Sequence, residues 1–491
     1  MKLNKKIILV MVAVLSLFFV LVTNLVINTV FPSDKLISAS EGEAKEAERL
    51  MQAKILRGTV YDRNGNKLAY SEFVNKNGVE TQKRIYPYEE LFAHTVGFYR
   101  GNYDGGRKNL EERWNSELLA ISKEDEEKIK NTNNSNLVEG ASMQLTLDYS
   151  MTAHAKEEFE QMAQTRGTQY EDFLGSVIVM NPRTGEIYCM YSNPSFNPDA
   201  EYLSDNWNVL ETDEKKPFVS RATGSVKIPG SVFKIVTAMA AVENGEDRHI
   251  INDEGVTIIG DTRVVNDDQT AHGNVDLKKA IELSSNVYFA TLSQHIEQDD
   301  FMDVAEKFFI NEELVLDIPV KDASIQENMN EGEYAAAAYG QGTVEVTPLH
   351  MAMVASAVAN DGVLVKPYMV ESVTCSNGDV IYTAGENDEG WPITVMEKST
   401  NRIVGGMVRC VESGTGWRAA VPGITVAGKT GTAQVTGARP HTWFIGFAPA
   451  YDPQIAICVM CENSDGGGGS VCGPIARGMI EYCRDNGFIT E

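Results

Sequence analysis

The first part of the chain contains one long apolar segment between two polar ones. Residues Ile7–Phe31 include no charged side chain, and most are Ile, Leu, Val, Met or Phe. A helix of this length spans about 37 Å, which is enough to cross a hydrocarbon core of roughly 30 Å. Lys2, Lys5 and Lys6 precede the segment, and such residues favour the cytoplasmic side. The pattern predicts a cytoplasmic tail at residues 1–6, a transmembrane anchor at 7–31 and an extracytoplasmic remainder.

A cleaved signal peptide is the alternative to an anchor. Its apolar region would usually be shorter and would be followed by small residues that suit cleavage. Here the apolar run is longer and ends in Asn28, Thr29, Val30, Phe31 and Pro32. We therefore expect an uncleaved, single-pass anchor in the cytoplasmic membrane.

Polar sequence after the anchor predicts a stalk and then a small β-rich region. Ser40 and Glu43 have the spacing of a capping box, which predicts a polar helix through about Ala53. The segment Arg57–Tyr70 reads as two short strands around an Asn64-Gly65 turn. A different kind of domain therefore begins near Arg57.

A polar stretch, Ser122–Gly140, predicts a loop or linker with a domain boundary near its end. The exported part would then comprise residues 32–140 and residues 141–491. A chain of 491 residues is long enough for two or three domains, in agreement with this division.

The larger unit has strand-like sequence at both ends and helical sequence between them. The strand-like segments are Gln144–Asp148, Gly175–Met190 (two strands), Ile424–Gln434, His441–Ala448 and Gln454–Cys461. Helices are expected from about residue 149 to Gln164 and from Pro474 to Tyr482, the latter after a Gly-rich loop at Gly466–Gly469. These patterns predict an α+β fold in which one antiparallel sheet is flanked by helices and adjoins an all-helical lobe.

Composition narrows the classes of partner. The formal net charge of -26 argues against a nucleic-acid-binding protein, which needs a basic face to displace counterions from phosphates. It also disfavours electrostatic attachment to an anionic lipid surface. Any membrane association must therefore be hydrophobic, as the anchor provides.

The seven cysteines predict neither a disulfide framework nor a metal site. Seven is an odd number, and the residues are scattered through apolar sequence. Cys458 and Cys461 have the spacing of a redox or zinc pair, but they lie in a segment that reads as a buried strand. We expect buried free thiols and no cofactor.

Ser231 and Lys234 are the first candidates for catalysis. Pro229 and Gly230 interrupt the preceding structure, and an apolar helix starts at or near Ser231. Two residues three apart share one face of a helix, so the hydroxyl and the amine can meet. A lysine in an apolar pocket can lose its proton near neutral pH and accept the proton of the serine. About two Ser-x-x-Lys matches are expected by chance in a chain of this length, so the spacing alone is weak evidence. The Pro-Gly pair and the apolar helix strengthen the hypothesis.

Ser284 and Asn286 are the second pair. They interrupt two helical patterns, so their side chains can project together from a short connection. Ser204-Asp205-Asn206 offers the same spacing, but it precedes the nucleophile and lies in polar, loop-like sequence. The hypothesis therefore uses Ser284.

Lys429-Thr430-Gly431-Thr432 is the third element. On a strand, a cation and hydroxyls along one edge suit a substrate carboxylate. Gly423–Thr430 also matches the spacing of a phosphate-binding loop. A true phosphate loop leads into a helix, whereas the residues after Thr430 favour a strand, so we exclude nucleotide binding.

The three elements, in this order, resemble the S-x-x-K, S-x-N and K-T-G set of β-lactamases and penicillin-binding proteins. Over nearly all of its exported part the chain resembles the class B, monofunctional penicillin-binding proteins. Arg57–Ala69 and Arg84–Phe98 are similar to their N-terminal pedestal domain, and Tyr339–Ala352 and His441–Pro449 to their transpeptidase domain. One departure is Asn109, where the family more often has Gly.

The resemblance implies a role for each motif residue. Ser231 would attack the carbonyl between two D-alanines, Lys234 would take its proton, and Ser284, linked to Lys234 and Lys429, would pass a proton to the departing D-alanine. His441 lies in family-like sequence and is expected to be structural. The implied reaction is peptidoglycan D-Ala-D-Ala transpeptidation, and β-lactams would acylate the same serine.

Further residues would bind the substrate. The resemblance assigns Asn286, Thr430, Gly431 and Thr432 to this task, and it implies that Lys429 holds the terminal carboxylate together with the two threonines. The backbone N–H groups of Ser231 and Thr432 would form the oxyanion hole.

The resemblance also implies partners. Peptidoglycan stem peptides would be the substrate, residues 32–140 would form the stalk and a dimerisation-like pedestal, and a separate membrane glycosyltransferase of the SEDS type would supply glycan strands.

Three alternatives stay open at this point. A D,D-carboxypeptidase would resolve the acyl-enzyme with water, a β-lactamase would hydrolyse the antibiotic, and a penicillin-binding sensor or scaffold would not turn over. No Glu-x-x-Leu-Asn follows Ser284, where class A β-lactamases carry the glutamate that activates water.

Overall fold

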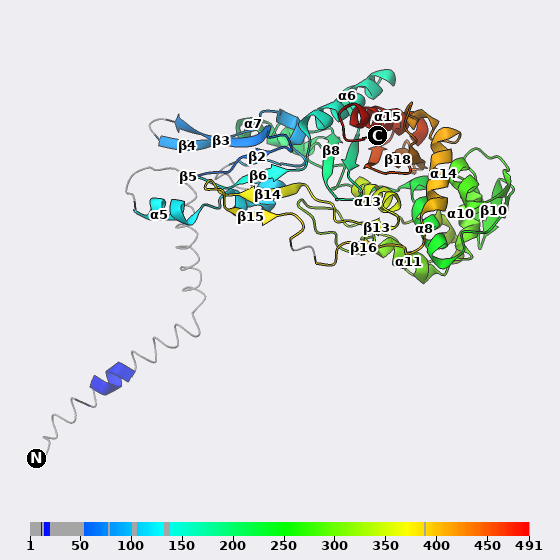
Figure 1. Ribbon diagram of the computed structural model, residues 1–491, viewed down its shortest axis with the longest axis horizontal. Coiled ribbons are helices and arrows are strands. Elements are labelled where there is room, and N and C mark those ends of the chain that lie inside the picture. The colour runs from blue at the N-terminus through cyan, green and yellow to red at the C-terminus, as the bar shows by residue number, and fades with distance from the viewer. Residues whose placement is uncertain are drawn as a thin grey trace, which may run out of the picture.

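The computed structural model describes residues 11, 14–19, 54–76, 79–100, 106–131, 138–386 and 389–490. They form an elongated molecule with a six-stranded sheet at one end, and with a five-stranded sheet and a helical lobe toward the other (Figure 1). Most of the predicted anchor and the whole predicted stalk helix lie outside the described residues. Within the described part of the chain, no helix has both the length and the apolar character needed to cross a membrane.

The five-stranded sheet joins strands from both ends of the larger unit, as the sequence predicts. Its order is β17-β18-β19-β7-β8, and all neighbours are antiparallel. The strands are β7 (Gly175–Met180), β8 (Ile187–Asn193), β17 (Ala427–Ala433), β18 (His441–Ala448) and β19 (Ile455–Cys461). β17 is an edge strand, so one of its sides is available to the helical lobe.

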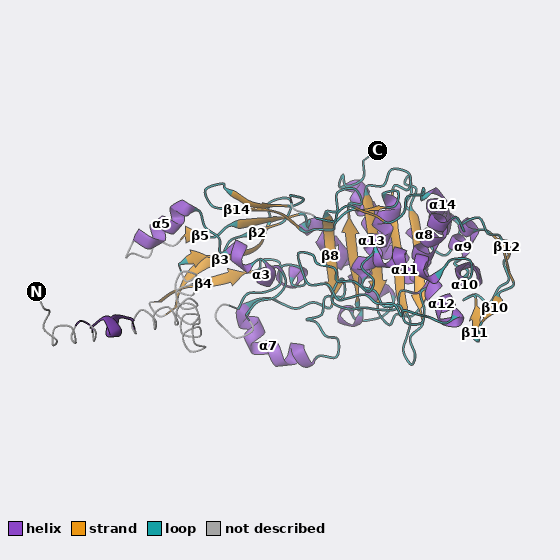
Figure 2. Ribbon diagram, turned by 90° about the horizontal axis from the view of Figure 1, so that it is seen from below, coloured by secondary structure: helices purple, strands orange, loops and turns teal. Residues whose placement is uncertain are grey.

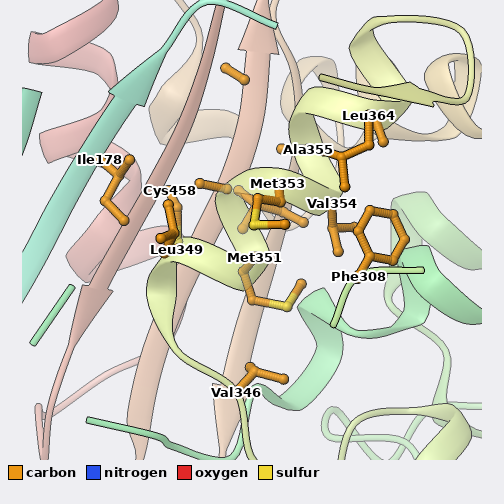
Figure 3. Packing of buried hydrophobic residues seen from close by; sticks show 14 of the residues in the cluster. Ile178, Phe308, Val346, Leu349, Met351, Met353, Val354, Ala355, Leu364 and Cys458 are labelled. Atoms are coloured by element: carbon orange, nitrogen blue, oxygen red, sulfur yellow. The ribbon is translucent and has the colours of Figure 1, made fainter. Parts of the chain in front are cut away.

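Helices cover both faces of this sheet. Side chains of α13 (Pro348–Ala359) pack on one face with Ile178 and Cys458, as Figure 3 shows. Alternate strand residues face α6 (Tyr149–Thr165) and α15 (Gly468–Asp485) on the other side. Because both faces are covered, nearly every residue of the five strands is buried, and the strands read as continuous apolar runs rather than as alternating ones.

The last helix begins earlier than the sequence indicates. The predicted Gly466–Gly469 loop is partly helical, because α15 starts at Gly468 rather than at Pro474. A Cβ atom on Gly468 would lie 2.2 Å from the Trp443 carbonyl oxygen. The glycines therefore allow the first turn of α15 to approach the sheet closely, which sequence pattern alone does not reveal.

The helical lobe lies beside β17 (Figure 2). Its helices are α8 (Lys234–Asn244), α9 (Leu277–Leu283), α10 (Asn286–Ser293), α11 (Gln298–Glu306), α12 (Glu331–Ala338) and α14 (Asn401–Glu412). Two small antiparallel sheets pack at its outer side (Figure 2). One pairs β9 (Ile251–Asp253) with β12 (Gly273–Val275), and the other is the hairpin of β10 (Val256–Ile259) and β11 (Thr262–Val265). The predicted α+β fold is confirmed.

The six-stranded sheet has the order β15-β14-β6-β2-β3-β4. Its strands are β2 (Val60–Tyr61), β3 (Lys67–Lys76), β4 (Val79–Ile85), β6 (Ser142–Leu145), β14 (Val370–Thr374) and β15 (Val380–Thr383). β2 and β3 flank the predicted Asn64-Gly65 turn, in which Asp62 Oδ1 accepts hydrogen bonds from the backbone N–H groups of Asn64 (2.9 Å) and Asn66 (2.7 Å). This sheet uses strands from both sides of residue 140, and the domain division stays a prediction.

Shorter elements complete this end of the molecule. They are β1 (Ile55–Leu56), η1 (Glu89–Phe92), α3 (Leu110–Arg113), α4 (Asn115–Leu118), β5 (Val138–Glu139) and α7 (Ala200–Thr212). Elsewhere, η2 (Tyr170–Asp172) contacts β8, and β13 (Val363–Leu364) pairs with β16 (Ile393–Thr394). Asn109 precedes α3 with a φ of 56°, and its side chain donates to the carbonyl oxygen of His94 (3.0 Å). A positive φ favours glycine, which accounts for the family preference at this position.

Two predicted loops are helical. Within the predicted linker, Lys123–Asn131 forms α5, and residues 132–137 lie outside the described part. The Ser122 hydroxyl accepts from the Asp125 N–H (3.1 Å), and Lys128 pairs with Asp125 (2.9 Å), so local capping and an ion pair stabilise a helix that lacks an apolar stripe. The stretch around Ser204 lies in α7, for which Asp199 provides the cap.

A buried ion cluster joins the six-stranded sheet to α3. Glu111 is fully buried between Arg57 and Arg84, and its Oε1 accepts from Arg84 Nε at 2.7 Å. Burial alone would raise the pKa of Glu111, but the charges of Arg57 and Arg84 hold it below its ordinary value. The carboxylate is therefore ionised at neutral pH and neutralises two buried cations.

We expect Glu111→Gln to lower the free energy of unfolding by about 3 kcal/mol, because two guanidinium groups would be left buried without an anion. Urea denaturation at pH 7 measures this change. Glu112→Gln is the control, since Glu112 is the exposed neighbour and should change stability by less than about 0.5 kcal/mol. The difference between wild type and Glu111→Gln should be full above about pH 4.5 and should shrink as the pH falls through the lowered pKa of the native carboxyl. Equal stabilities of the two variants would contradict this account.

Candidate active site

Ser231 lies on a single 3-10 turn, η3 (Gly230–Val232), directly before α8. The sequence places an apolar helix at or near this serine, and the structure shows that the α-helix itself starts at Lys234. Gly230 has a φ of 58° and its N–H donates to the carbonyl oxygen of Gly340 at 2.9 Å. A Cβ atom on Gly340 would lie 2.0 Å from the Gly230 carbonyl oxygen. Glycine at 340 therefore allows a second backbone segment to support the serine turn.

The Lys234 amine is fully buried and lies against the serine. Its Nζ is 2.9 Å from Ser231 Oγ, 2.6 Å from the Ser284 carbonyl oxygen, 2.6 Å from Asn286 Oδ1 and 3.3 Å from Ser284 Oγ. Burial, and then the charge of Lys429, lower the pKa of Lys234 well below its ordinary value. A neutral amine at this place can accept the proton of the Ser231 hydroxyl.

Ser284 connects the two lysines. It caps the C-terminus of α9 with a φ of 60°, and its Oγ accepts from Lys429 Nζ at 2.8 Å. Since the same Oγ is 3.3 Å from Lys234 Nζ, the hydroxyl can relay a proton between the lysines and a bound molecule. The structure brings together Ser231, Lys234, Ser284 and Lys429 in the arrangement that the motifs predict.

Asn286 is the first residue of α10, and protein groups surround its amide. Oδ1 lies at Lys234, while Nδ2 donates to the Val265 carbonyl oxygen at 2.8 Å and lies 3.3 Å from Asp267 Oδ1. The side chain thus orients the lysine in this structure. Its expected bond to the peptide part of a substrate stays a prediction.

Lys429 projects from the edge strand β17. Burial lowers the pKa of its amine to about 8, so it is largely protonated at pH 7. The amine also donates to the Thr430 carbonyl oxygen at 2.8 Å. After β17 the chain continues into β18 rather than into a helix, which confirms the exclusion of a phosphate-binding loop.

The other residues of the third motif lie beside the serine turn. A Cβ atom on Gly431 would be 2.8 Å from the Pro229 carbonyl oxygen, so β17 and the serine turn are in close contact. Thr430 Oγ1 is 2.6 Å from Thr415 Oγ1, and Thr432 Oγ1 accepts from the Gly468 N–H at 3.3 Å. The two threonine hydroxyls are held in place by Thr415 and by the first residue of α15.

Comparison with known proteins places this arrangement in a family. Residues 175–481, which are more than half of the chain, match the family described as the penicillin binding protein transpeptidase domain. The chain belongs to this family. The family resemblance seen in the three motifs is confirmed.

Individual relatives agree with the family match. The chain is 26% identical to the peptidoglycan D,D-transpeptidase PbpA of Mycolicibacterium smegmatis, and the alignment covers 96% of each chain. The structure is similar to that of the D,D-transpeptidase domain of a peptidoglycan glycosyltransferase from Eggerthella lenta, with a TM-score of 0.74, 28% identity, and coverage of 89% of this chain and 100% of that one. It is also similar to penicillin-binding protein A of M. tuberculosis solved as a penicillin G acyl-enzyme complex, with a TM-score of 0.76, 25% identity, and coverage of 87% and 99%.

Two other sequence expectations concern the cysteines and His441. All seven cysteines are buried free thiols, as predicted. His441 is buried at the start of β18, where burial lowers its pKa to about 4 and its Nδ1 accepts from the Asn463 N–H at 3.2 Å. These contacts agree with a structural role.

Sequence reasoning missed several residues that contact the transpeptidase motifs. Thr415 bonds to the hydroxyl of the motif residue Thr430, and Asp253 and Asn266 contact Ser285, the middle residue of the Ser-x-Asn motif. Ser285 could have been recognised as the cap of α10, because a serine before an apolar helix is a capping signal. The remaining three come from distant loops and carry no local pattern.

We expect the two active-site lysines to titrate below the ordinary lysine value of about 10.4. NMR titration of side chains labelled with ¹³C at the ε-carbon should show a midpoint near 8 for Lys429 and a midpoint well below 10.5 for Lys234. Lys234→Arg and Lys429→Arg assign the two signals. A midpoint of 10 or higher for either residue would refute the proposed burial effect.

Proposed function

We propose that the protein is a peptidoglycan D,D-transpeptidase with Ser231 as its nucleophile. The observation that carries the proposal is the 2.9 Å contact between Ser231 Oγ and the buried, readily deprotonated amine of Lys234. The family match and the relatives named peptidoglycan D,D-transpeptidases support the substrate, a stem peptide that ends in D-Ala-D-Ala.

Acylation uses the groups around the serine. Ser231 Oγ attacks the carbonyl carbon between the two D-alanines while Lys234 takes the hydroxyl proton. The carbon–nitrogen bond then breaks, and Ser284, which lies 2.8 Å from Lys429 Nζ, passes a proton to the departing D-alanine amine. The acyl group stays on Ser231 as an ester.

Substrate binding uses the edge strand. The Lys429 cation and the hydroxyls of Thr430 and Thr432 suit the terminal carboxylate, with Gly431 leaving room between strand and serine turn. The backbone N–H groups of Ser231 and Thr432 would stabilise the oxyanion, a contribution of about 3 kcal/mol per donor. Asn286 would bond the peptide part of the substrate.

The second half of the reaction forms the cross-link. An amine from a neighbouring stem peptide attacks the ester carbonyl, the new carbon–nitrogen bond forms, and Ser231 regains its proton as the ester bond breaks. β-Lactams would acylate the same serine, and the structural likeness to a penicillin G acyl-enzyme supports this. A D,D-carboxypeptidase, in which water replaces the amine, and a sensor or scaffold without turnover use the same site.

The setting of the reaction is part of the proposal. Residues 7–31 would anchor the chain in the cytoplasmic membrane with residues 1–6 inside, and residues 32–140 would form the stalk and pedestal. A SEDS-type membrane glycosyltransferase would supply the glycan strands. The uncharged apolar segment and the three lysines before it support this orientation.

Ser231→Ala should abolish covalent labelling by a fluorescent penicillin, because it removes the proposed nucleophile, the hydroxyl that lies 2.9 Å from the Lys234 amine. Gel fluorescence and peptide mass spectrometry of the full chain measure the adduct. Ser204→Ala is the matched control, since Ser204 belongs to the other Ser-x-Asn sequence and lies exposed on α7. A labelled Ser231→Ala protein would exclude this nucleophile.

Turnover separates the related functions. With paired stem peptides, a cross-linked product identifies a transpeptidase, and release of D-alanine without cross-linking identifies a carboxypeptidase. Stable acylation without either product identifies a sensor. Penicillin that is released within seconds as its hydrolysed acid would instead indicate a β-lactamase.

The second-order rate constant for acylation should show a bell-shaped dependence on pH. The acid limb arises because Lys234 must be neutral to accept the serine proton, and the alkaline limb should fall near pH 8, where Lys429 loses the charge that attracts the carboxylate. Stopped-flow measurements from pH 5 to 10 test this. Lys429→Arg should move the alkaline limb beyond the measured range, and an unchanged limb would assign it to another group.

A further inference from the structure

The turn between α9 and α10 carries Ser284 and Asn286 of the transpeptidase site. The residue between them, Ser285, bonds to groups outside the site. Ser284 adopts the left-handed conformation, which a serine seldom occupies without support. Ser285 turns the other way and is fully buried. Its hydroxyl donates to Asp253 Oδ2 at 2.6 Å and accepts from the Tyr288 N–H at 2.9 Å. The side chain of Ser285 therefore ties the turn to Asp253.

Asp253 ends strand β9 and is also fully buried. Besides Ser285, its carboxylate accepts from the Gly255 N–H (2.8 Å), from Asn266 Nδ2 (2.8 and 2.9 Å) and from His272 Nδ1 (2.8 Å). Burial would raise the pKa of Asp253, but these donors hold it below its ordinary value. The carboxylate is a saturated acceptor around which four segments converge.

The segment of Val265 and Asn266 contacts the turn between α9 and α10 at two more points. Asn266 Oδ1 accepts from the Val287 N–H at 3.1 Å, and the Val265 carbonyl oxygen accepts from Asn286 Nδ2 at 2.8 Å. His272 is held on its other side by Asp268, which lies 3.0 Å from Nε2. Because both ring nitrogens face carboxylates, the pKa of His272 is raised above its ordinary value despite burial.

We propose that Asp253 is a positioning residue for acyl transfer. With Asn266 and His272 it fixes Ser285, and it thereby places Ser284 Oγ and Asn286 Oδ1 at the Lys234 amine. The proposal rests on the proposed function, because it assigns Asp253 to the proton transfers that pass through Lys234 and Ser284. Asp253 itself contacts neither the serine nucleophile nor the substrate.

The positions of the two lysine amines explain why the contacts of Asp253 should affect the rate of acylation. Ser284 Oγ lies 2.8 Å from one lysine and 3.3 Å from the other, so a small rotation of the turn would break the shared contact. Displacement of a reacting group by about 1 Å can cost a factor of about 100 in rate, even when its cause is remote from the chemistry. Binding of a β-lactam carboxylate by β17 would be little affected, because β17 belongs to the sheet.

The test measures acylation of the full-length protein, in detergent micelles, by a fluorescent penicillin. Stopped-flow traces over a range of concentrations give the limiting acylation rate constant and the half-saturating concentration separately. For Asp253→Asn we expect the limiting rate constant to fall at least tenfold, with the half-saturating concentration within threefold of wild type. Asp261→Asn, the same change at an exposed residue of the neighbouring hairpin, should leave both constants within twofold.

His272 provides the second pair of variants. His272→Leu removes a donor to Asp253 and should lower the limiting rate constant, whereas His272→Gln, which keeps an N–H donor, should recover most of it. A purely structural role would lower the melting temperature without separating the two kinetic constants and without this recovery. The proposal is overturned if Asp253→Asn keeps a limiting rate constant within twofold of wild type. If Asp253→Asn does not fold, the same result for His272→Leu overturns it. Absence of acylation in the wild-type protein would instead overturn the proposed function.

Discussion

Two buried lysines that share one serine hydroxyl are the constraint on which the rest of the structure depends. Lys234 and Lys429 are both fully buried, and Ser284 Oγ lies between their amines. Burial disfavours an ammonium ion, and the charge of Lys429 adds repulsion, so the Lys234 amine gives up its proton far more readily than lysine does in water. The structure assigns that role to Lys234, whose pKa falls well below its ordinary value, while Lys429 keeps a pKa of about 8. Lysine thus supplies both the base, Lys234, and the cation, Lys429.

Holding the amines together requires close contact between a sheet edge and a helical lobe. Lys429 belongs to β17 and Lys234 to α8, and the backbones between them pass within the distance that glycine alone allows at residues 230, 340 and 431. Covering helices bury the sheet on both faces, which fixes the edge strand. The lobe is fixed in turn by the hairpin loops around Asp253. The precision needed at Ser284 therefore comes from a sheet edge and a helical lobe that share one hydrophobic core and meet at this turn.

The sequence predicted those parts of the fold in which local pattern and tertiary structure agree. β18 has the predicted bounds of His441–Ala448, because its apolar run is buried on both faces. The Asn64-Gly65 turn is confirmed, since its chemistry is local. The helix α5 was missed because capping and an ion pair, rather than apolar periodicity, stabilise it. The helix α7 was missed because its short apolar stripe of Leu203, Trp207 and Leu210 lies in otherwise polar sequence. The three motifs located the site, but Asp253 acts through contacts with residues up to 32 positions away, which no local pattern can indicate.

Hydrogen bonds join the six-stranded sheet directly to the five-stranded sheet, and this junction affects where the active site is held. The chain leaves the six-stranded sheet after β6, and Thr146 Oγ1 then donates to the Ile187 carbonyl oxygen (2.8 Å) in the five-stranded sheet, while the Thr146 N–H donates to the Met369 carbonyl oxygen (2.8 Å) beside β14. The Asp148 N–H donates to the Tyr188 carbonyl oxygen at 2.8 Å, and its side chain caps α6. These hydrogen bonds, from the Thr146 hydroxyl and from backbone N–H groups, couple the two sheets directly at their junction. Because strands from distant parts of the chain complete the six-stranded sheet, neither half can rotate without breaking main-chain contacts. Helix α8, which starts at Lys234, lies on the far side of the five-stranded sheet from the described N-terminal strands (Figure 1), so these contacts hold the site at a defined distance from those strands. For an enzyme proposed to be anchored at its N-terminal end, such rigidity would set the height above the membrane at which cross-links form.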